Sequence, residues 1–116
     1  MKLPQEIIRD GLERTGWEVT DIRNSDLYHW ADEVWVLMSV WQPHCIAYLT
    51  FLVDPMYWAE PHKKGENVYA VGASVDDPAT YGAKRPDAIT YVGKHTAAQL
   101  PELLEKLAAM RRQRDR

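Results

Sequence analysis

The sequence predicts an α+β fold: a two-layer sandwich in which a five-stranded, mainly antiparallel sheet carries an N-terminal and a C-terminal helix on one face. Apolar residues recur at helical spacing at both ends of the 116-residue chain. Two long apolar runs in the middle flank a proline-containing turn, and shorter strand-like runs lie on either side. The expected order is α-β-β-β-β-β-α, in a single globular domain spanning residues 1–116.

The N-terminal helix is indicated by an apolar stripe. Pro4 suits the first turn, where the missing N–H needs no partner. Gly16 follows the last turn, where glycine readily adopts the left-handed conformation that ends a helix. The stripe consists of Leu3, Ile7, Ile8 and Leu12.

A first strand is expected from Trp17 to about Arg23, followed by a turn at Asn24–Asp26, whose short polar side chains can bond their own backbone. The stretch from Leu27 to Glu33 fits either a loop or the start of a strand.

The central hairpin, with strands near Val34–Trp41 and Cys45–Val53, is the clearest signal. We expect a turn with Pro43 at its second position and Gln42 opposite Cys45. This register divides the apolar residues into two sets. The set expected beneath the helices is Val34, Val36, Met38, Val40, Ala47, Leu49, Phe51 and Val53. The second face carries Trp35, Leu37, Trp41, Ile46, Tyr48 and Leu52.

Two further strands and a helix complete the expected fold. A fourth strand is predicted over 67–75 and a short fifth strand over 88–93, with long loops before each. Thr96 and Gln99 have capping-box spacing, but Pro101 is unfavourable inside a helix. The main C-terminal helix is therefore expected to begin at Pro101, after a short turn. Its apolar stripe is Leu100, Leu103, Leu104, Leu107 and Met110.

The second sheet face is the main candidate for function, because two helices can cover only one face. Leaving that face in water forfeits roughly 1.5–3 kcal/mol for each large side chain, and such patches usually mark an interface. Small residues Ala70 and Gly72 next to it predict a shallow groove. The covering element is predicted to be a protein partner or a second copy in a homodimer, and the alternative is that the chain's own long loops fold over the face.

A second candidate site lies where three loops meet at one end of the predicted sheet. Histidines near carboxylates predict a metal site or a small enzyme as the alternative function, although no catalytic or metal-binding motif is present. The purely structural explanation is that the aromatic residues pack the loops onto the sheet edge. The candidate pocket residues are Tyr28, His29, Trp30, Tyr57, Trp58, His62 and His95.

Composition narrows the function classes. A net charge of −3 argues against a nucleic-acid partner, and no apolar run is long enough to span a membrane. Cys45 is the only cysteine, which together with the polar N-terminus favours a cytoplasmic protein. The basic tail 111–116 is expected to be the solvated, partly disordered end of the last helix. The sequence favours a non-catalytic interaction module without a cofactor.

Overall fold

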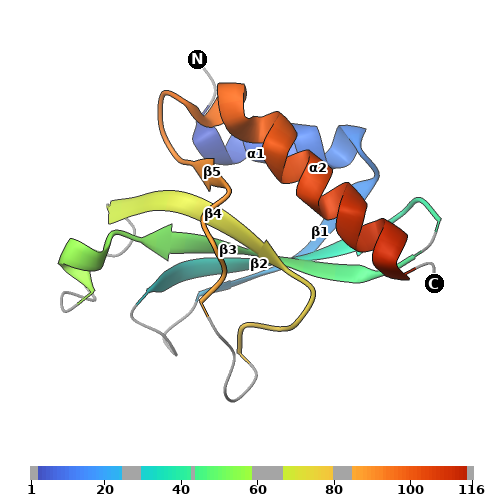
Figure 1. The fold of residues 1–116 in the computed structure, drawn as a ribbon, viewed down its shortest axis with the longest axis horizontal. Helices are drawn as coiled ribbons and strands as arrows, with labels where there is room; N and C mark the ends of the chain where they lie inside the picture. Colours follow the sequence, from blue (N-terminus) through green and yellow to red (C-terminus); the bar gives the residue numbers. More distant parts are fainter. Residues whose placement is uncertain (1–2, 25–29, 43, 59–66, 80–84, 115–116) are drawn as a thin grey trace.

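Two helices lie on one face of a five-stranded antiparallel sheet, as the sequence predicts (Figure 1). The computed structural model describes residues 3–24, 30–42, 44–58, 67–79 and 85–114. Each strand pairs with the strand before it in the chain, so the sheet is a simple meander in the order β1-β2-β3-β4-β5. Within these ranges no helix combines the length and apolar character needed to cross a membrane.

The five strands follow the predicted order, but the fifth strand is shorter than the predicted 88–93. A short 3-10 turn, η1 (Pro55–Tyr57), follows the third strand, where the Asp54 side chain accepts a hydrogen bond from the Met56 N–H. The fifth strand is only two residues long. The strands are β1 (Trp17–Asn24), β2 (Ala31–Ser39), β3 (Ile46–Val53), β4 (Val68–Ser74) and β5 (Thr90–Tyr91).

The C-terminal helix begins earlier than predicted. Helix α2 spans Thr96–Arg114 without interruption, so the predicted start at Pro101 is wrong. The Thr96 hydroxyl accepts a hydrogen bond from the Gly93 N–H and fixes the start of the helix. Pro101 leaves only the Ala97 carbonyl without its helical donor, and Ala97 is exposed to water. The N-terminal helix α1 (Pro4–Arg14) has Pro4 in its first turn, as expected.

The register of the central hairpin differs from the predicted one. Ser39, not Gln42, lies opposite Cys45, and its N–H donates to the Cys45 carbonyl over 2.8 Å. Trp35 pairs with Leu49 in the same register. The predicted register is wrong by three residues, and an odd shift exchanges the two faces of β2 relative to β3.

The pairing of β2 with β3 ends at Ser39 because the next residue, Val40, bonds to the turn between α1 and β1 instead. The Val40 N–H donates to the Gly16 carbonyl over 2.8 Å, at the turn between α1 and β1. Trp41 then packs against Gly16, whose φ is +81°, and a Cβ at that position would lie 2.3 Å from Trp41 Cδ2. Glycine is therefore required at this turn for both its backbone angle and its lack of a side chain.

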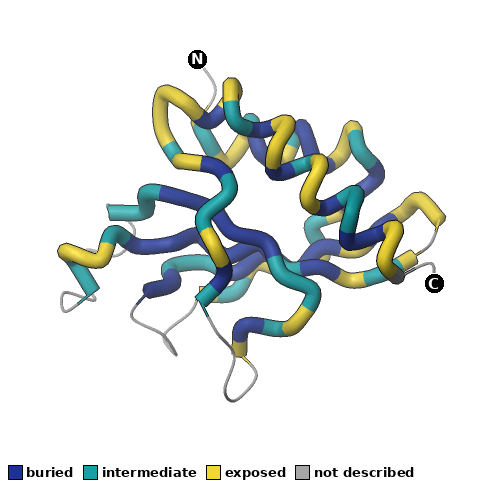
Figure 2. The backbone as a smooth tube through the Cα atoms, in the orientation of Figure 1, coloured by how far each residue is buried: buried dark blue, intermediate teal, exposed yellow. Residues whose placement is uncertain are grey.

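The main core lies between the helices and the sheet (Figure 2). Trp35 and Leu37 point into it, so their predicted assignment to the second face is wrong. The Trp35 ring lies 4.8 Å from that of Phe51, and its Nε1–H donates to Glu33, which satisfies its polar atom. The other buried members are Ile8, Leu12, Trp17, Ala47, Leu49, Val71, Ala73, Leu100, Leu103, Leu107 and Met110.

Part of the second face is covered by the chain's own connection between β4 and β5. Figure 1 shows the start of this connection, just after β4, on the side of the sheet opposite the helices. Asp77 in this described start binds Arg23 on the far edge strand β1. Near its end, Pro86 and Asp87 lie so close to Gly72 that a Cβ there would be 2.6 Å from the Asp87 carbonyl oxygen. The alternative of a loop cover is confirmed for this part of the face.

The Arg23–Asp77 pair makes this cover sensitive to acid. Partial burial alone would raise the pKa of Asp77, but the hydrogen bond and charge of Arg23, together with the Ala79 N–H, lower it below its ordinary value of 3.8. A lowered folded-state pKa means that the stabilisation is present above the unfolded-state pKa and is lost as pH falls through the folded-state value.

We therefore expect Asp77→Asn to lower the free energy of unfolding at pH 7 by up to about 1 kcal/mol, a small value because Arg23 is 41% exposed. The difference from wild type should shrink as pH falls below 3.8 and through the lowered folded-state pKa of Asp77. Urea unfolding at several pH values measures it, with Asp87→Asn in the same connection as control. A difference that does not shrink at all as pH falls into this acidic range would contradict the role given to this pair.

Candidate functional site

A buried arginine organises the end of the hairpin. Arg111 of α2 is 8% exposed. Its Nε–H donates to the Ser39 hydroxyl over 2.7 Å, and its Nη2 donates to the carbonyls of Thr15 and Gly16 over 2.9 and 3.1 Å. One guanidinium thus joins α2, the turn after α1 and the end of β2, three segments far apart in the sequence.

Two indole rings surround the same guanidinium. Its central carbon lies 4.4 Å from the centroid of Trp17 and 5.2 Å from that of Trp41. Indole faces attract a cation most strongly where water is excluded. Burial lowers the pKa of Arg111 more than an electrostatic interaction with Cys45 raises it. The group still stays protonated at neutral pH, so the site holds a positive charge on neutral oxygen acceptors and ring faces.

Hydrogen bonds within the loop fix the connection from β2 to β3. The buried Ser39 hydroxyl donates to the Trp41 carbonyl over 2.7 Å. The His44 Nδ1 lies 2.8 Å from the Ser39 carbonyl, and its Nε2 lies 3.0 Å from the Gln42 amide nitrogen. A neutral imidazole with its proton on Nδ1 satisfies both contacts. The loop is therefore held by its own bonds as well as by Arg111.

Exposed apolar side chains gather at this end of the hairpin. Of the eight exposed large apolar residues in the described part of the chain, four lie between Met38 and Ile46. We call Met38, Val40, Trp41 and Ile46 the hairpin-end surface; they are 42%, 49%, 52% and 44% exposed. Met38 and Ile46 are cross-strand partners on the second face, just beyond the part covered by the β4–β5 connection.

A hollow of about 590 Å³ adjoins this surface. It forms where β3 extends beyond the end of β4, since the pairing of these strands ends at Tyr48 and Ser74. The lining residues are His44, Cys45, Ile46, Tyr48 and Val75. An exposed apolar ridge beside a hollow with a mixed polar and apolar lining is a shape that can receive a side chain from another molecule.

The predicted interface residues separate into accessible and buried groups. Trp41 and Ile46 are exposed, and Tyr48 is half-buried in the wall of the hollow. Trp35 and Leu37 are buried beneath the helices. Leu52, Ala70 and Gly72 are buried on the opposite face of the sheet. The predicted groove along Ala70 and Gly72 is filled by Pro86 and Asp87.

The predicted pocket falls only partly on described residues. Tyr28, His29 and His62 lie outside them. Trp30 is buried with Trp58 packed against its cluster, whereas His95 is exposed. Tyr57 is half-buried in the turn after β3. Among the described residues no group of His, Cys, Asp and Glu is arranged to hold a metal ion.

The aromatic cluster instead fastens a loop to the sheet. Trp58 Nε1–H donates to the Val53 carbonyl over 2.8 Å. The Arg85 guanidinium lies 5.9 Å from the Trp58 ring and donates to the Tyr69 hydroxyl. These contacts match the alternative in which the aromatic residues pack long connections onto the end of the sheet.

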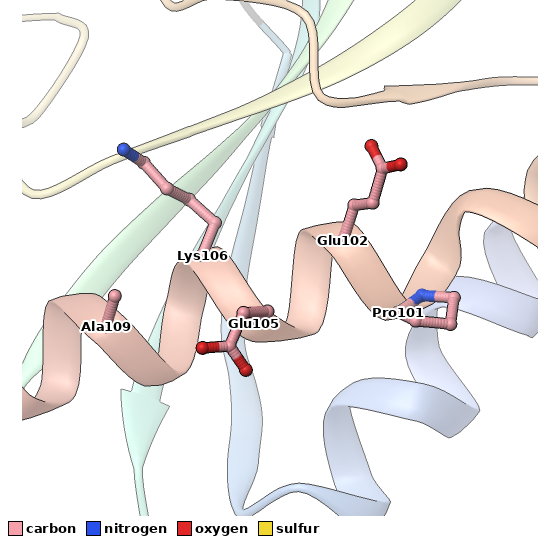
Figure 3. A pocket seen from close by; sticks show the side chains of 5 residues that line it. All are labelled: Pro101, Glu102, Glu105, Lys106 and Ala109. Carbon is pink, nitrogen blue, oxygen red and sulfur yellow. The ribbon is translucent and has the colours of Figure 1, made fainter.

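The outer surface of α2 carries a further hollow, of about 630 Å³. Figure 3 shows its lining: Pro101, Glu102, Glu105, Lys106 and Ala109, all from this one helix. In this view Glu102 and Lys106 point to one side of the helix and Glu105 to the other. One convex helix cannot enclose a ligand, so we assign no site there.

Sequence reasoning missed Arg111, Met38 and Val40. Arg111 was placed in a solvated basic tail, whereas it is buried next to the exposed Arg112. The available signal was spacing, because Arg111 follows Leu100, Leu103, Leu107 and Met110 on the buried side of α2. Met38 and Val40 were assigned to the core by the wrong register.

No protein-family model, curated protein or solved structure matches this chain.

We expect Arg111→Met to lower the free energy of unfolding by roughly 2–4 kcal/mol, because three hydrogen bonds to a charged group and two ring contacts are lost. Arg111→Lys should recover little, since one ammonium cannot reproduce the planar fork. Arg112→Met, at the exposed neighbour, is the control and should change stability by less than about 0.5 kcal/mol. Urea unfolding measures all three variants, and equal losses for Arg111→Met and Arg112→Met would contradict the role of the guanidinium.

Proposed function

We propose that this protein is a non-catalytic interaction module that binds a protein partner through the hairpin-end surface and its adjoining hollow. The observation that carries the proposal is that four of the eight exposed large apolar side chains of the described residues come from one end of the β2–β3 hairpin. Leaving large apolar groups in water forfeits free energy that a partner recovers on binding.

The contacts that hold this end of the hairpin support the same proposal. Ser39, at the root of the loop, is fully buried and bonded to Arg111, and Trp41 is packed on Gly16. A surface that is already held in one shape loses less conformational entropy when a partner binds. Tryptophan and tyrosine, here Trp41 and Tyr48, are also typical of the residues that contribute most to binding energy.

A selection from a phage-displayed library of random peptides tests the proposal. We expect enriched peptides whose binding is lost in Met38→Lys and in Ile46→Lys, since each change places a charge where an apolar anchor must be desolvated. These side chains are outside the core, so both variants should unfold at nearly the wild-type urea concentration.

Met56→Lys is the matched control, because Met56 is the most exposed of the large apolar residues in the described ranges and follows β3, at the opposite end of that strand from Ile46. Peptides should bind this variant as they bind wild type. Failure to enrich any peptide, or binding that survives both hairpin variants, would overturn the proposed function.

A further inference from the structure

Strand β1 forms one edge of the sheet and is open to pairing with a strand from another molecule. It has eight residues and pairs only with β2 among the described strands. At the opposite end of the sheet, β5 has only two residues. The unpaired N–H and C=O groups of an edge strand are a template for a further strand, so the outer side of β1 is a candidate interaction surface.

The hydrogen bonding of β2 determines which of its backbone groups point toward β1. The Ser39 N–H donates toward β3, to the Cys45 carbonyl. Backbone groups point alternately to the two sides of a strand, so those of Met38 and Val36 point to β1. The Thr20 hydroxyl agrees with this direction, because it donates to the Val36 carbonyl over 3.2 Å.

Two residues of β1, Val19 and Ile22, therefore present their backbone groups to the outside. Glu18 and Asp21 lie opposite the two residues of β2 whose groups point to β1, so they bond inward and their neighbours turn outward. None of the described residues supplies a hydrogen-bond partner for the outward groups. Their spacing is three residues because the pairing with β2 shifts between Val19 and Asp21, which marks a β-bulge.

The sequence of β1 is complementary to itself about a two-fold axis between residues 20 and 21. When two copies pair antiparallel about this axis, Val19 of one copy lies opposite Ile22 of the other, and Glu18 lies opposite Arg23. The first pair joins the outward backbone groups and two apolar side chains. The second joins opposite charges. Each pair occurs twice, because a two-fold axis exchanges the copies.

The side chains within each pair also lie on the same face of the sheet. Ile22 is the cross-strand partner of Trp35, which faces the helices, and Val19 packs against the same core. Glu18 and Arg23, each next to one of them in the strand, point to the opposite face. Side chains that are directly opposite on one face are the pairs that stabilise an antiparallel sheet.

The exposed side chains of β1 can make these contacts. Ile22 is 43% exposed, and Glu18 is exposed as well. Arg23 binds Asp77 through Nη1 and contacts Asp21 through Nε, with 41% of its side chain exposed. Its Nη2 has no partner among the described residues and can bind Glu18 of a second copy.

The charges and the bulge favour a second copy over an unrelated strand. Both features commonly protect an edge against pairing with other proteins. A second copy has the same bulge at the centre of the pair, so the spacing of the outward groups matches on the two strands. It also presents the opposite charge at each charged position.

We propose that the chain forms a symmetric homodimer through antiparallel pairing of β1 with β1 of a second copy. The dimer joins two five-stranded sheets into one continuous sheet. This inference is independent of the proposed function, because none of the residues of the hairpin-end surface belongs to β1.

Sedimentation equilibrium and native-state hydrogen exchange test the dimer and its location. Wild type should dimerise reversibly as its concentration rises. The Val19 and Ile22 amides should be protected in the dimer and lose this protection on dilution, because their bonds exist only between copies. The Glu18 amide bonds within the chain, so its protection should not depend on concentration.

Two charge variants and their mixture test the register. Glu18→Lys and Arg23→Glu each place like charges opposite one another twice, so each variant alone should dimerise roughly tenfold more weakly or worse. In an equimolar mixture every charged pair again has opposite signs, so a heterodimer should form with nearly wild-type affinity. The control Glu102→Lys makes the same charge change as Glu18→Lys on an exposed position of α2 and should dimerise as wild type does.

Ile22→Lys supplies a test that does not depend on the folding of Arg23→Glu. It replaces an exposed apolar side chain, so the variant should unfold at nearly the wild-type urea concentration and should dimerise at least roughly tenfold more weakly.

A chain that stays monomeric at every concentration would overturn the proposal. So would a dimer that Ile22→Lys does not weaken, or a mixture of the two folded charge variants that fails to associate. A dimer disrupted by Ile46→Lys instead of Ile22→Lys would place the second copy at the hairpin end and overturn the pairing of β1.

Discussion

The contact on which the hairpin end depends is the guanidinium of Arg111 between Trp17 and Trp41. A buried cation must find acceptors for its donors, and here the Ser39 hydroxyl and the carbonyls of Thr15 and Gly16 supply them. These oxygens belong to segments that the helices and sheet would otherwise leave loosely connected. The end of α2, the turn after α1 and the hairpin loop are thereby held as one unit, which gives the exposed apolar residues a fixed shape.

The sequence predicted the elements of the fold more accurately than their register. Helical spacing located α1 and α2, and apolar runs separated by turn residues located β2 to β4, because local patterns determine local structure. The register of the β2–β3 hairpin was wrong because both faces of β2 are apolar, so patterning could not distinguish them. The deciding contact joins Ser39 to Arg111, 72 residues away, and no local pattern contains that information.

The candidate site could be predicted only in part, because local patterns identify apolar residues but not the segments that cover them. Trp41, Ile46 and Tyr48 were recognised as apolar residues in need of a cover, and all three belong to the accessible hairpin end or its hollow. The prediction that the second face has a cover was correct, but part of that cover is the chain's own β4–β5 connection. Its course follows from the contact of Asp77 with Arg23 and from the close approach of Pro86 to Gly72. Such contacts depend on the folded geometry.

Native-state hydrogen exchange of the Val40 amide measures whether Arg111 holds the hairpin end together. This N–H donates to the Gly16 carbonyl, which also accepts from Arg111, so the amide reports whether the hairpin end is held as one unit. We expect slow exchange in wild type and exchange at least tenfold faster in Arg111→Met under conditions where both proteins stay folded. Fast exchange in wild type, or an unchanged rate in the variant, would contradict it.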